Sequence, residues 1–331
     1  MRGVRIAITG AAGFLGQMLV KTLSTRNTMA LNGEPRRISA IIANDIAAEP
    51  LDRLARLRRV HALPGALSDP ATLARLAEDS PDLVIHLAAV VSGQAEADFD
   101  LGMAVNLHGT VDLVNACRAM RRPPVLIFAS SVAVFSCASN ATITEDTPPA
   151  PRSSYGTQKL MGELLVRDAT RRGFIHGRSL RFPTIAVRPG APNRAASGFA
   201  SGILREPLAG LPADLPVGRE LRLHLGSPAR ALNHILTAAA LAQEALGGEP
   251  TITLPGISVT VDEMIDTLAR LAGPETAALI RPAPDPATEA IVASWPGGIE
   301  TPRARALGFA PNADFAELLR EHMDRTGVAA A

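Results

Sequence analysis

Residues 4–16, VRIAITGAAGFLG, decide the fold of this chain of 331 residues. The run from Val4 to Thr9 is short, apolar and rich in β-branched side chains, which is typical of a strand buried on both faces of a parallel sheet. Three glycines follow at once with the spacing G-x-x-G-x-x-G, and leucines then recur at helical intervals as Leu15, Leu19 and Leu23. The stretch therefore predicts a strand, a tight turn and a helix.

A turn of this kind favours the binding of a dinucleotide. A glycine backbone can approach a pyrophosphate closely, and the N-terminus of the following helix offers unpaired N–H groups and the positive end of the helix dipole. The residues expected at the cofactor are Gly10, Gly13, Phe14, Leu15 and Gly16. A tight turn without a ligand is the alternative, because three spaced glycines alone are a weak pattern.

The chain after this turn continues to alternate between strands and helices. Strands are predicted over residues 38–43, 82–87 and 125–129, and helices over 69–78 and 105–120. This alternation predicts an α/β fold with a doubly wound parallel (Rossmann) sheet.

From about residue 190 the sequence changes to short segments that are interrupted by Pro and Gly. Helices are predicted over residues 229–244, 261–271 and 314–325, and short strands near Leu221 and Thr251. We therefore expect a dinucleotide-binding Rossmann domain over 1–189 and a smaller substrate-binding lobe over 190–331, with the chain free to cross back between the lobes.

The end of the second predicted strand indicates which dinucleotide is bound. Asp45 lies there, where a sheet of this type presents residues to the adenosine ribose. A carboxylate accepts hydrogen bonds from ribose hydroxyls and repels a 2′-phosphate, and residues 46–48 contain no arginine that could neutralise one. NAD is therefore expected in preference to NADP. The alternative for Asp45 is a turn or helix-capping residue.

Composition excludes several other classes of protein. A formal net charge of +1 gives no basic field for nucleic acid or an anionic membrane surface. Cys117 and Cys137 have neither metal-site spacing nor the number needed for a disulfide framework, so we expect no metal. We see no signal-peptide pattern at the N-terminus and no stretch of 18 apolar residues. We expect a soluble cytoplasmic protein.

The only tyrosine of the chain, Tyr155, stands four residues before Lys159, one of only two lysines. Four residues are about one helical turn, so a helix here places phenol and ammonium on one face. We expect the ammonium to favour the phenolate and to lower the pKa of the tyrosine, which would make it a general base. The alternative is a tyrosine that only packs at the start of a helix.

Together these residues resemble the extended short-chain dehydrogenase/reductase family, also described as NAD-dependent epimerases/dehydratases. The glycine pattern, His86-Leu87-Ala88-Ala89, Asn106, Ser130-Ser131 and the Tyr155/Lys159 pair occur in the family's order. The resemblance implies a catalytic set of Ser131, Tyr155 and Lys159, with Ser130 the less favoured serine. It also implies cofactor contacts from the following residues: Asp45, Leu67, Ala88, Ala89, Asn106, Tyr155, Lys159 and Pro183.

Within this family, residues 90–94, 181–190 and 201–208 look like the subgroup of D-erythronate 2-dehydrogenases. Thr184 stands where sugar-nucleotide epimerases usually have Asn. The resemblance implies NAD-dependent oxidation of the C2 hydroxyl of a small sugar acid, D-erythronate to 2-oxo-D-erythronate. The substrate residues expected are Ser92, Ser131, Tyr155 and Arg188.

The carboxylate of such an acid needs a fixed cation, and a guanidinium matches its geometry. Arg188 is the first candidate, with Arg205 and Arg230 as alternatives. Two other functions stay open at this point: a nucleotide-sugar epimerase or dehydratase with a retained NAD, and a non-catalytic NAD-sensing protein. The sequence is compatible with a homodimer.

Overall fold

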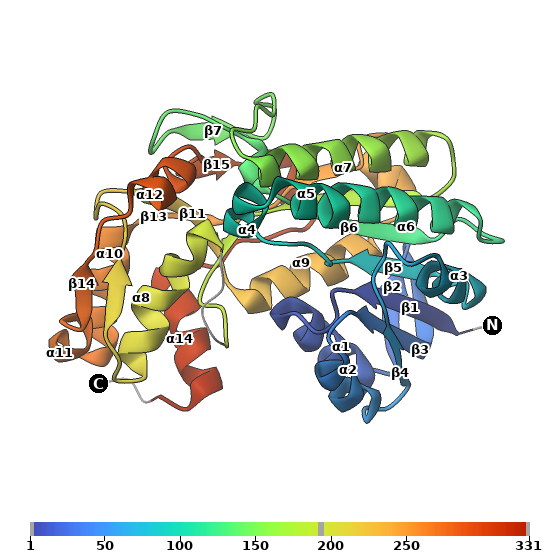
Figure 1. The fold of residues 1–331 in the computed structure, drawn as a ribbon, viewed down its shortest axis with the longest axis horizontal. Coiled ribbons are helices and arrows are strands. Elements are labelled where there is room, and N and C mark those ends of the chain that lie inside the picture. The colour runs from blue at the N-terminus through green and yellow to red at the C-terminus, as the bar shows by residue number, and fades with distance from the viewer. Residues whose placement is uncertain (1–2, 191–194, 329–331) are drawn as a thin grey trace.

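The computed structural model describes residues 3–190 and 195–328, so the outermost residues of both predicted domains and 191–194 lie outside the described residues. The chain forms a larger lobe around one sheet and a smaller lobe beside it (Figure 1).

The sheet of the larger lobe runs in the order β12-β8-β6-β5-β1-β3-β2, with β4 paired to β3. All pairs are parallel except β2 with β3. Thr9 at the end of β1 lies opposite Asn44 of β3 and His86 of β5, so the carboxyl ends of these strands share one edge. The strands are β1 (Val4–Thr9), β2 (Thr28–Leu31), β3 (Glu34–Asp45), β4 (Val60–Pro64), β5 (Leu83–His86), β6 (Val125–Ser131), β8 (His176–Phe182) and β12 (Thr251–Thr253).

Helices cover both faces of this sheet, which confirms the doubly wound prediction. Ile6 and Ile8 of β1 pack in a core cluster with residues of α1, α2 and α9, whereas Ala7 packs in another with residues of α3, α6 and α7. This alternation is what a strand with two buried faces requires. The helices are α1 (Phe14–Thr25), α2 (Ala48–Ala55), α3 (Pro70–Glu78), α4 (Ser92–Ala97), α5 (Phe99–Gly102), α6 (Gly109–Arg118), α7 (Ser154–Arg171) and α9 (Pro228–Ala240).

Two segments of the larger lobe differ from the sequence-based prediction. The strand predicted over residues 38–43 is the middle of the longer β3, whose first residues form an antiparallel hairpin with β2. The helix predicted over 105–120 is not a single α-helix: a π-helical turn, Met103–His108, precedes α6. Such turns are rare and often occur at functional sites, and this one carries Asn106.

The smaller lobe is built on its own apolar core, which includes Leu223, Met264, Leu319 and Trp295. β11 lies between β9 and β13, and the remaining short strands form the pairs β10-β14 and β15-β7. The elements are β7 (Thr142–Thr144), β9 (Thr184–Ile185), α8 (Phe199–Leu208), β10 (Ala213–Leu215), β11 (Arg222–Gly226), β13 (Ile257–Thr260), α10 (Val261–Ala272), α11 (Pro274–Ala277), β14 (Ile280–Pro282), α12 (Pro286–Val292), β15 (Gly298–Glu300) and α14 (Phe315–Thr326). The short helix α13 (Pro302–Ala306) packs Ala304 in the core of the larger lobe.

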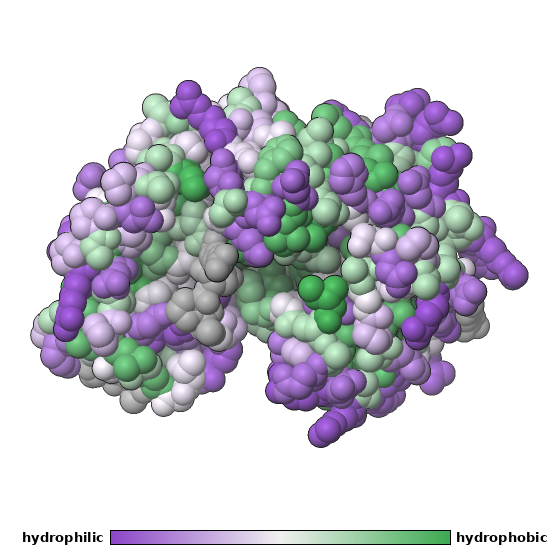
Figure 2. Space-filling model, viewed as in Figure 1, coloured by the Kyte–Doolittle hydropathy of each residue, from purple (hydrophilic) through white to green (hydrophobic). Residues whose placement is uncertain are grey.

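A single cut at residue 189 does not separate the two lobes. β12 pairs with β8 in the large sheet, and α9 contributes Ile235 and Ala238 to the core cluster around Ile6. Residues 228–254 therefore return to the larger lobe, and β7 extends from residues before the cut to pair with β15. Figure 2 shows a deep hollow between the lobes, on the side where α1 faces α8 and α14 in Figure 1.

Candidate active site

The carboxyl edge of the sheet carries the glycine turn, and its geometry suits a dinucleotide. A Cβ on Gly10 would lie 2.6 Å from the backbone nitrogen of Ala88, and one on Gly16 would lie 2.2 Å from the carbonyl oxygen of Gly10. By contrast, a Cβ on Gly13 would meet only the Gly10 oxygen, at 3.2 Å. Gly13 immediately precedes α1 as its N-cap, and no side chain caps that end. The close packing of Gly10 and Gly16 and the uncapped N-terminus of α1 suit the binding of a pyrophosphate.

Asp45 lies at the end of β3 beside this turn. Its Oδ2 accepts a hydrogen bond from the backbone N–H of Ala12 at 2.9 Å, and its Oδ1 accepts one from Ala47 at 3.1 Å. The carboxylate thus fixes the turn, and each oxygen keeps a lone pair for another donor. The prediction that Asp45 binds ribose hydroxyls is compatible with this geometry and stays a prediction.

The wild-type enzyme should accordingly prefer NAD to NADP, and Asp45→Asn should narrow that preference. Asparagine keeps one oxygen for the glycine turn and removes the charge that would repel a 2′-phosphate. The kcat/KM values for both cofactors measure the preference. Equal values for NAD and NADP in the wild-type enzyme would refute the assignment of Asp45.

The Tyr155/Lys159 pair lies on α7, as predicted. Ser153 caps the helix by accepting a hydrogen bond from the N–H of Gly156 at 3.1 Å. The Nζ of Lys159 lies 5.6 Å from the centroid of the Tyr155 ring and 4.9 Å from that of Phe128. Lys159 is 2% exposed, so its ammonium is held among aromatic rings rather than in water.

The expected direction of the Tyr155 pKa is wrong. Burial raises the pKa of Tyr155 to about 12, and the groups that act against burial are the guanidinium of Arg188 and a hydrogen bond with Ser131. Burial also lowers the pKa of Lys159 to about 8, while the carboxylate of Glu163 acts to raise it. Sequence spacing identified Lys159 on the same helix, but burial dominates the pKa of Tyr155, and the cation that acts against burial is Arg188, from another segment.

The two serines at the end of β6 have different surroundings. Ser131 interacts with Tyr155, and its Oγ accepts a hydrogen bond from the N–H of Ala133 at 3.1 Å. The Oγ of Ser130 donates instead to Glu163 and is 3% exposed. Ser131 is therefore the serine placed to reach a substrate oxygen beside Tyr155.

A cavity of about 340 Å³ joins the glycine turn to this triad. Its size is within the usual range for small-molecule sites. The predicted site residues that line it are Gly10, Gly13, Phe14, Leu15, Gly16, Ala89, Ser92, Ser131, Tyr155, Lys159, Pro183 and Arg188. The structure thus brings together predicted residues that are spread between positions 10 and 188 of the sequence.

Arg188 is distinctive among the cavity residues because its Nη2 is buried and makes no hydrogen bond within the described part of the chain. Its backbone is clamped by α8: the N–H donates to Ser201 Oγ and the carbonyl accepts from Arg205 Nη1, both at 3.0 Å. Burial and the charge of Arg205 lower the pKa of Arg188, and Tyr155 acts to raise it. An arginine keeps its proton under such conditions, so a fixed cation faces the phenol.

The alternative arginines already have partners. Arg205 forms an ion pair with Glu206 at 2.5 Å, and Arg230 forms one with Glu317 at 3.2 Å. Arg205 lines a second cavity of about 540 Å³ that shares Phe14 and Arg188 with the first and also contains Lys21 and Arg325. Four cationic side chains thus line this second cavity, which adjoins the first at Phe14 and Arg188.

Other predicted cofactor residues hold the loops and strand ends around the cavity in place. Asn106 Oδ1 accepts from the N–H of Val90 at 2.9 Å, and its Nδ2 donates to Gln158 at 2.8 Å, so it holds the loop after β5. Ala88 packs against Gly10, and Leu67 is 8% exposed after β4. Their contacts with a bound cofactor stay predictions.

Ser92 ties the lobes together, because its Oγ accepts a hydrogen bond from the N–H of Ala196 at 3.1 Å. His86 bonds to Thr9 and Thr110, and burial lowers its pKa to about 3, so it is a neutral structural residue.

The prediction from sequence missed several residues of the cavity. Trp295 and Ser197 come from the smaller lobe, and Thr184 and Ile185 from β9. The sequence marks Thr184 as a difference from sugar-nucleotide epimerases, but it does not predict that this residue lines the cavity. No local pattern marks Trp295, whose only signal is that it is the sole tryptophan. Within residues 3–190 and 195–328, no group of three or more His, Cys, Asp or Glu side chains is placed to hold a metal, and no helix could cross a membrane.

A dinucleotide turn joined to a Ser-Tyr-Lys set defines a class of enzymes, and comparison with known proteins agrees. The model of the NAD dependent epimerase/dehydratase family matches residues 6–241. The chain therefore belongs to this family of extended short-chain dehydrogenases/reductases, and it is an NAD-dependent enzyme.

Individual relatives narrow the comparison. The chain is 46% identical over 327 residues to the D-erythronate dehydrogenase of Cupriavidus necator, covering 98% of this chain and 100% of that protein. It is 39% identical over 321 residues to the D-erythronate dehydrogenase of Haemophilus influenzae, covering 97% and 99%. The crystal structure of a nucleoside-diphosphate-sugar epimerase from Agrobacterium tumefaciens matches with a TM-score of 0.88 and 38% identity, covering 99% of this chain and 96% of that one.

Proposed function

We propose that the enzyme oxidises the C2 hydroxyl of D-erythronate to 2-oxo-D-erythronate. The observation that carries the proposal is the Nη2 of Arg188 beside Tyr155, which is buried and has no hydrogen-bond partner among residues 3–190 and 195–328. A buried guanidinium donor without an acceptor is costly unless a ligand supplies one, and a carboxylate is its best geometric match. A 2-hydroxy acid places its reacting hydroxyl one carbon away from such a carboxylate.

The surroundings of Arg188 support an anionic substrate. Lys21, Arg205 and Arg325 line the adjoining cavity. Among the described residues, Arg205 forms an ion pair with Glu206, and the charge of Glu321 acts on Arg325. A cleft lined by charge of one sign raises the local concentration of oppositely charged molecules. The similarity to the two D-erythronate dehydrogenases covers nearly the whole chain, which further supports a small sugar acid.

Four residues that line the cavity have a part in the proposed reaction. Arg188 would hold the C1 carboxylate and so set C2 beside Tyr155. The phenolate of Tyr155 would take the proton of the C2 hydroxyl, and Ser131 would hydrogen-bond the same oxygen. Lys159 would hold the nicotinamide ribose and favour the charged form of Tyr155. NAD, when bound, supplies the nicotinamide ring that accepts the hydride from C2.

A screen of four- to six-carbon aldonates with NAD, followed by the absorbance of NADH, tests this function. We expect D-erythronate to have the highest kcat/KM. Conversion of a sugar nucleotide without net production of NADH would instead indicate an epimerase with retained NAD. If neither reaction occurs with a folded protein, the proposed function is wrong.

The proposed setting is the cytoplasm, and the proposed assembly is a homodimer. Cys117 and Cys137 are both free thiols, as expected in a reducing compartment. Phe99 on α5 and Met161 and Leu164 on α7 are 43 to 58% exposed, and α5 and α7 lie side by side (Figure 1). A mass of two chains in sedimentation equilibrium, reduced to one chain by Leu164→Lys, is the expected result.

A further inference from the structure

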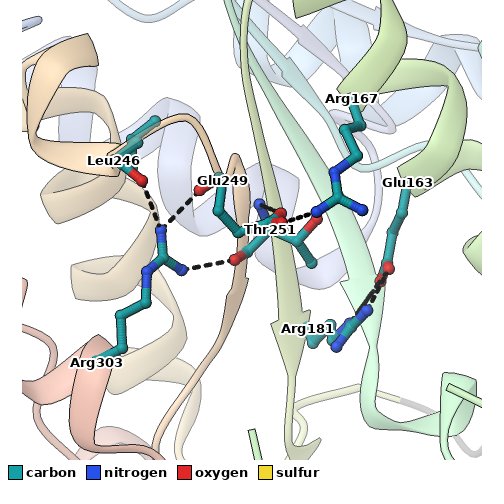
Figure 3. A network of polar contacts seen from close by, with 7 residues as sticks. All are labelled: Glu163, Arg167, Arg181, Leu246, Glu249, Thr251 and Arg303. Atoms are coloured by element: carbon teal, nitrogen blue, oxygen red, sulfur yellow. Dashed lines mark hydrogen bonds and ion pairs between the residues drawn. The ribbon is translucent and has the colours of Figure 1, made fainter. Parts of the chain in front are cut away.

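A buried ion pair between Arg181 and Glu163 lies one helical turn beyond Lys159 on α7. The Nη2 of Arg181 on β8 lies 2.7 Å from Oε2 of Glu163 on α7, and its Nε lies 3.0 Å from Oε1 (Figure 3). The side chains of Arg181 and Glu163 are 10% and 3% exposed. Ser130 donates a further hydrogen bond to the same carboxylate. Three donor atoms, two on Arg181 of β8 and one on Ser130 of β6, therefore fix the carboxylate of Glu163 in place.

Glu163 stands one helical turn after Lys159, as Lys159 stands one turn after Tyr155. Side chains four residues apart on a helix are neighbours, with Cβ atoms ~5 to 6 Å apart. The phenol, the ammonium and the carboxylate thus follow one face of α7, and both Lys159 and Glu163 are buried. Arg181 in turn packs its guanidinium 4.8 Å from the centroid of Phe135.

The other groups around Lys159 cannot supply a negative charge. On β5, His86 is neutral at working pH because burial lowers its pKa to about 3. On β6, Phe128 offers only its ring, and Ser130 is already bonded to Glu163. On β8, Arg181 is a cation. Within the described residues, Glu163 is therefore the carboxylate placed to support the ammonium.

We propose that Glu163, fixed by Arg181 and Ser130, is a positioning residue that keeps the ammonium of Lys159 charged and directed toward Tyr155. The physical need follows from burial, which lowers the pKa of Lys159 to about 8, while Glu163 acts to raise it. If the carboxylate is removed, the pKa of Lys159 falls further. Lys159 then loses its charge within the neutral range, and with it the support for the phenolate.

The composition of the chain makes a direct test feasible. Lys21 and Lys159 are its only lysines, so NMR of protein with isotope-labelled lysine side chains should give two signals. Lys21→Arg identifies the signal of Lys21. We expect Glu163→Gln to lower the pKa of Lys159 by ~1 unit or more, the effect typical of losing a close opposite charge. This readout needs neither cofactor nor substrate.

Two further variants separate charge from folding. Glu163→Gln alone leaves Arg181 buried without its partner, so the double variant Glu163→Gln/Arg181→Met removes both charges together. It should remain folded and show a smaller fall in the pKa of Lys159 than Glu163→Gln, because a cation is removed together with the carboxylate. Glu249→Gln is the matched control, because Glu249 pairs with Arg167 on the same helix but at side-chain exposures of 36% and 53% (Figure 3). It should leave the pKa of Lys159 unchanged.

The inference uses the proposed function only for its second readout, the pH dependence of D-erythronate oxidation. In the Glu163 variants the alkaline limb of kcat should move to lower pH by the same shift as the pKa of Lys159, with KM changed less than kcat. A pKa of Lys159 that stays within ~0.2 unit of wild type in folded Glu163→Gln protein would overturn the inference, and so would a folded double variant in which that pKa does not fall at all. Failure of every aldonate to react would refute the proposed function and leave the NMR result intact.

Discussion

Replacing Tyr155 by phenylalanine should lower kcat for sugar-acid oxidation by ~10²- to 10⁴-fold, the usual contribution of a general base. The ring would remain packed at the start of α7, where Tyr155 contacts the core of the smaller lobe, and only the proton acceptor would be lost. NAD affinity, measured by calorimetry, should change little. This separation of kcat from cofactor binding is the signature of a catalytic rather than a packing role.

The pH dependence provides a second check on Tyr155. Because burial raises its pKa to about 12, the phenolate is the minor form at neutral pH, and activity should rise with pH up to about 8, where Lys159 begins to lose its charge. This rise should be absent from the residual activity of the phenylalanine variant. A folded Tyr155→Phe enzyme whose kcat falls less than ~threefold would show that another group accepts the proton.

The second large effect is expected from Arg188→Met. Removing one partner of a desolvated charge pair commonly costs ~2 to 5 kcal/mol, compared with ~0 to 1 kcal/mol for an exposed pair. We therefore expect KM for D-erythronate to rise strongly while NAD affinity is nearly unchanged. Since Arg188 also acts to lower the pKa of Tyr155, its loss should raise that pKa and reduce kcat at neutral pH as well.

Arg230→Met is the matched control for this experiment. Arg230 is also partly buried, but it pairs with Glu317 and does not line either cavity at the site. Its replacement should leave kcat/KM for the acid close to the wild-type value. If Arg188→Met leaves kcat/KM unchanged in a folded enzyme, the carboxylate is held elsewhere, and Arg205 becomes the next residue to replace.

Much of the larger lobe could be predicted because its signals are local. The strand, glycine turn and helix over residues 4–25 are adjacent in sequence, and the spacing of Tyr155 and Lys159 already places both on one helical face. The cofactor edge follows from these elements because parallel strands bring their carboxyl ends together.

The rest depends on contacts between distant segments. The return of β12 to the large sheet is decided by its pairing with β8, more than 70 residues earlier in the chain. Trp295 reaches the cavity from the smaller lobe without any motif around it. The direction of the Tyr155 pKa was predicted wrongly because burial, which raises this pKa, is a property of the folded site that spacing on one helix cannot reveal.

The cavity contains the only tyrosine and the only tryptophan of a chain that is 3% aromatic. Both residues can therefore serve as intrinsic spectroscopic probes of the site, without an added label. Phenol and phenolate absorb differently in the ultraviolet, so an alkaline absorption difference spectrum reports the ionisation of Tyr155 alone. Trp295 is 8% exposed beside it, and indole emission overlaps the absorption band of reduced nicotinamide. Energy transfer from Trp295 would therefore follow the arrival and departure of NADH in the unmodified enzyme.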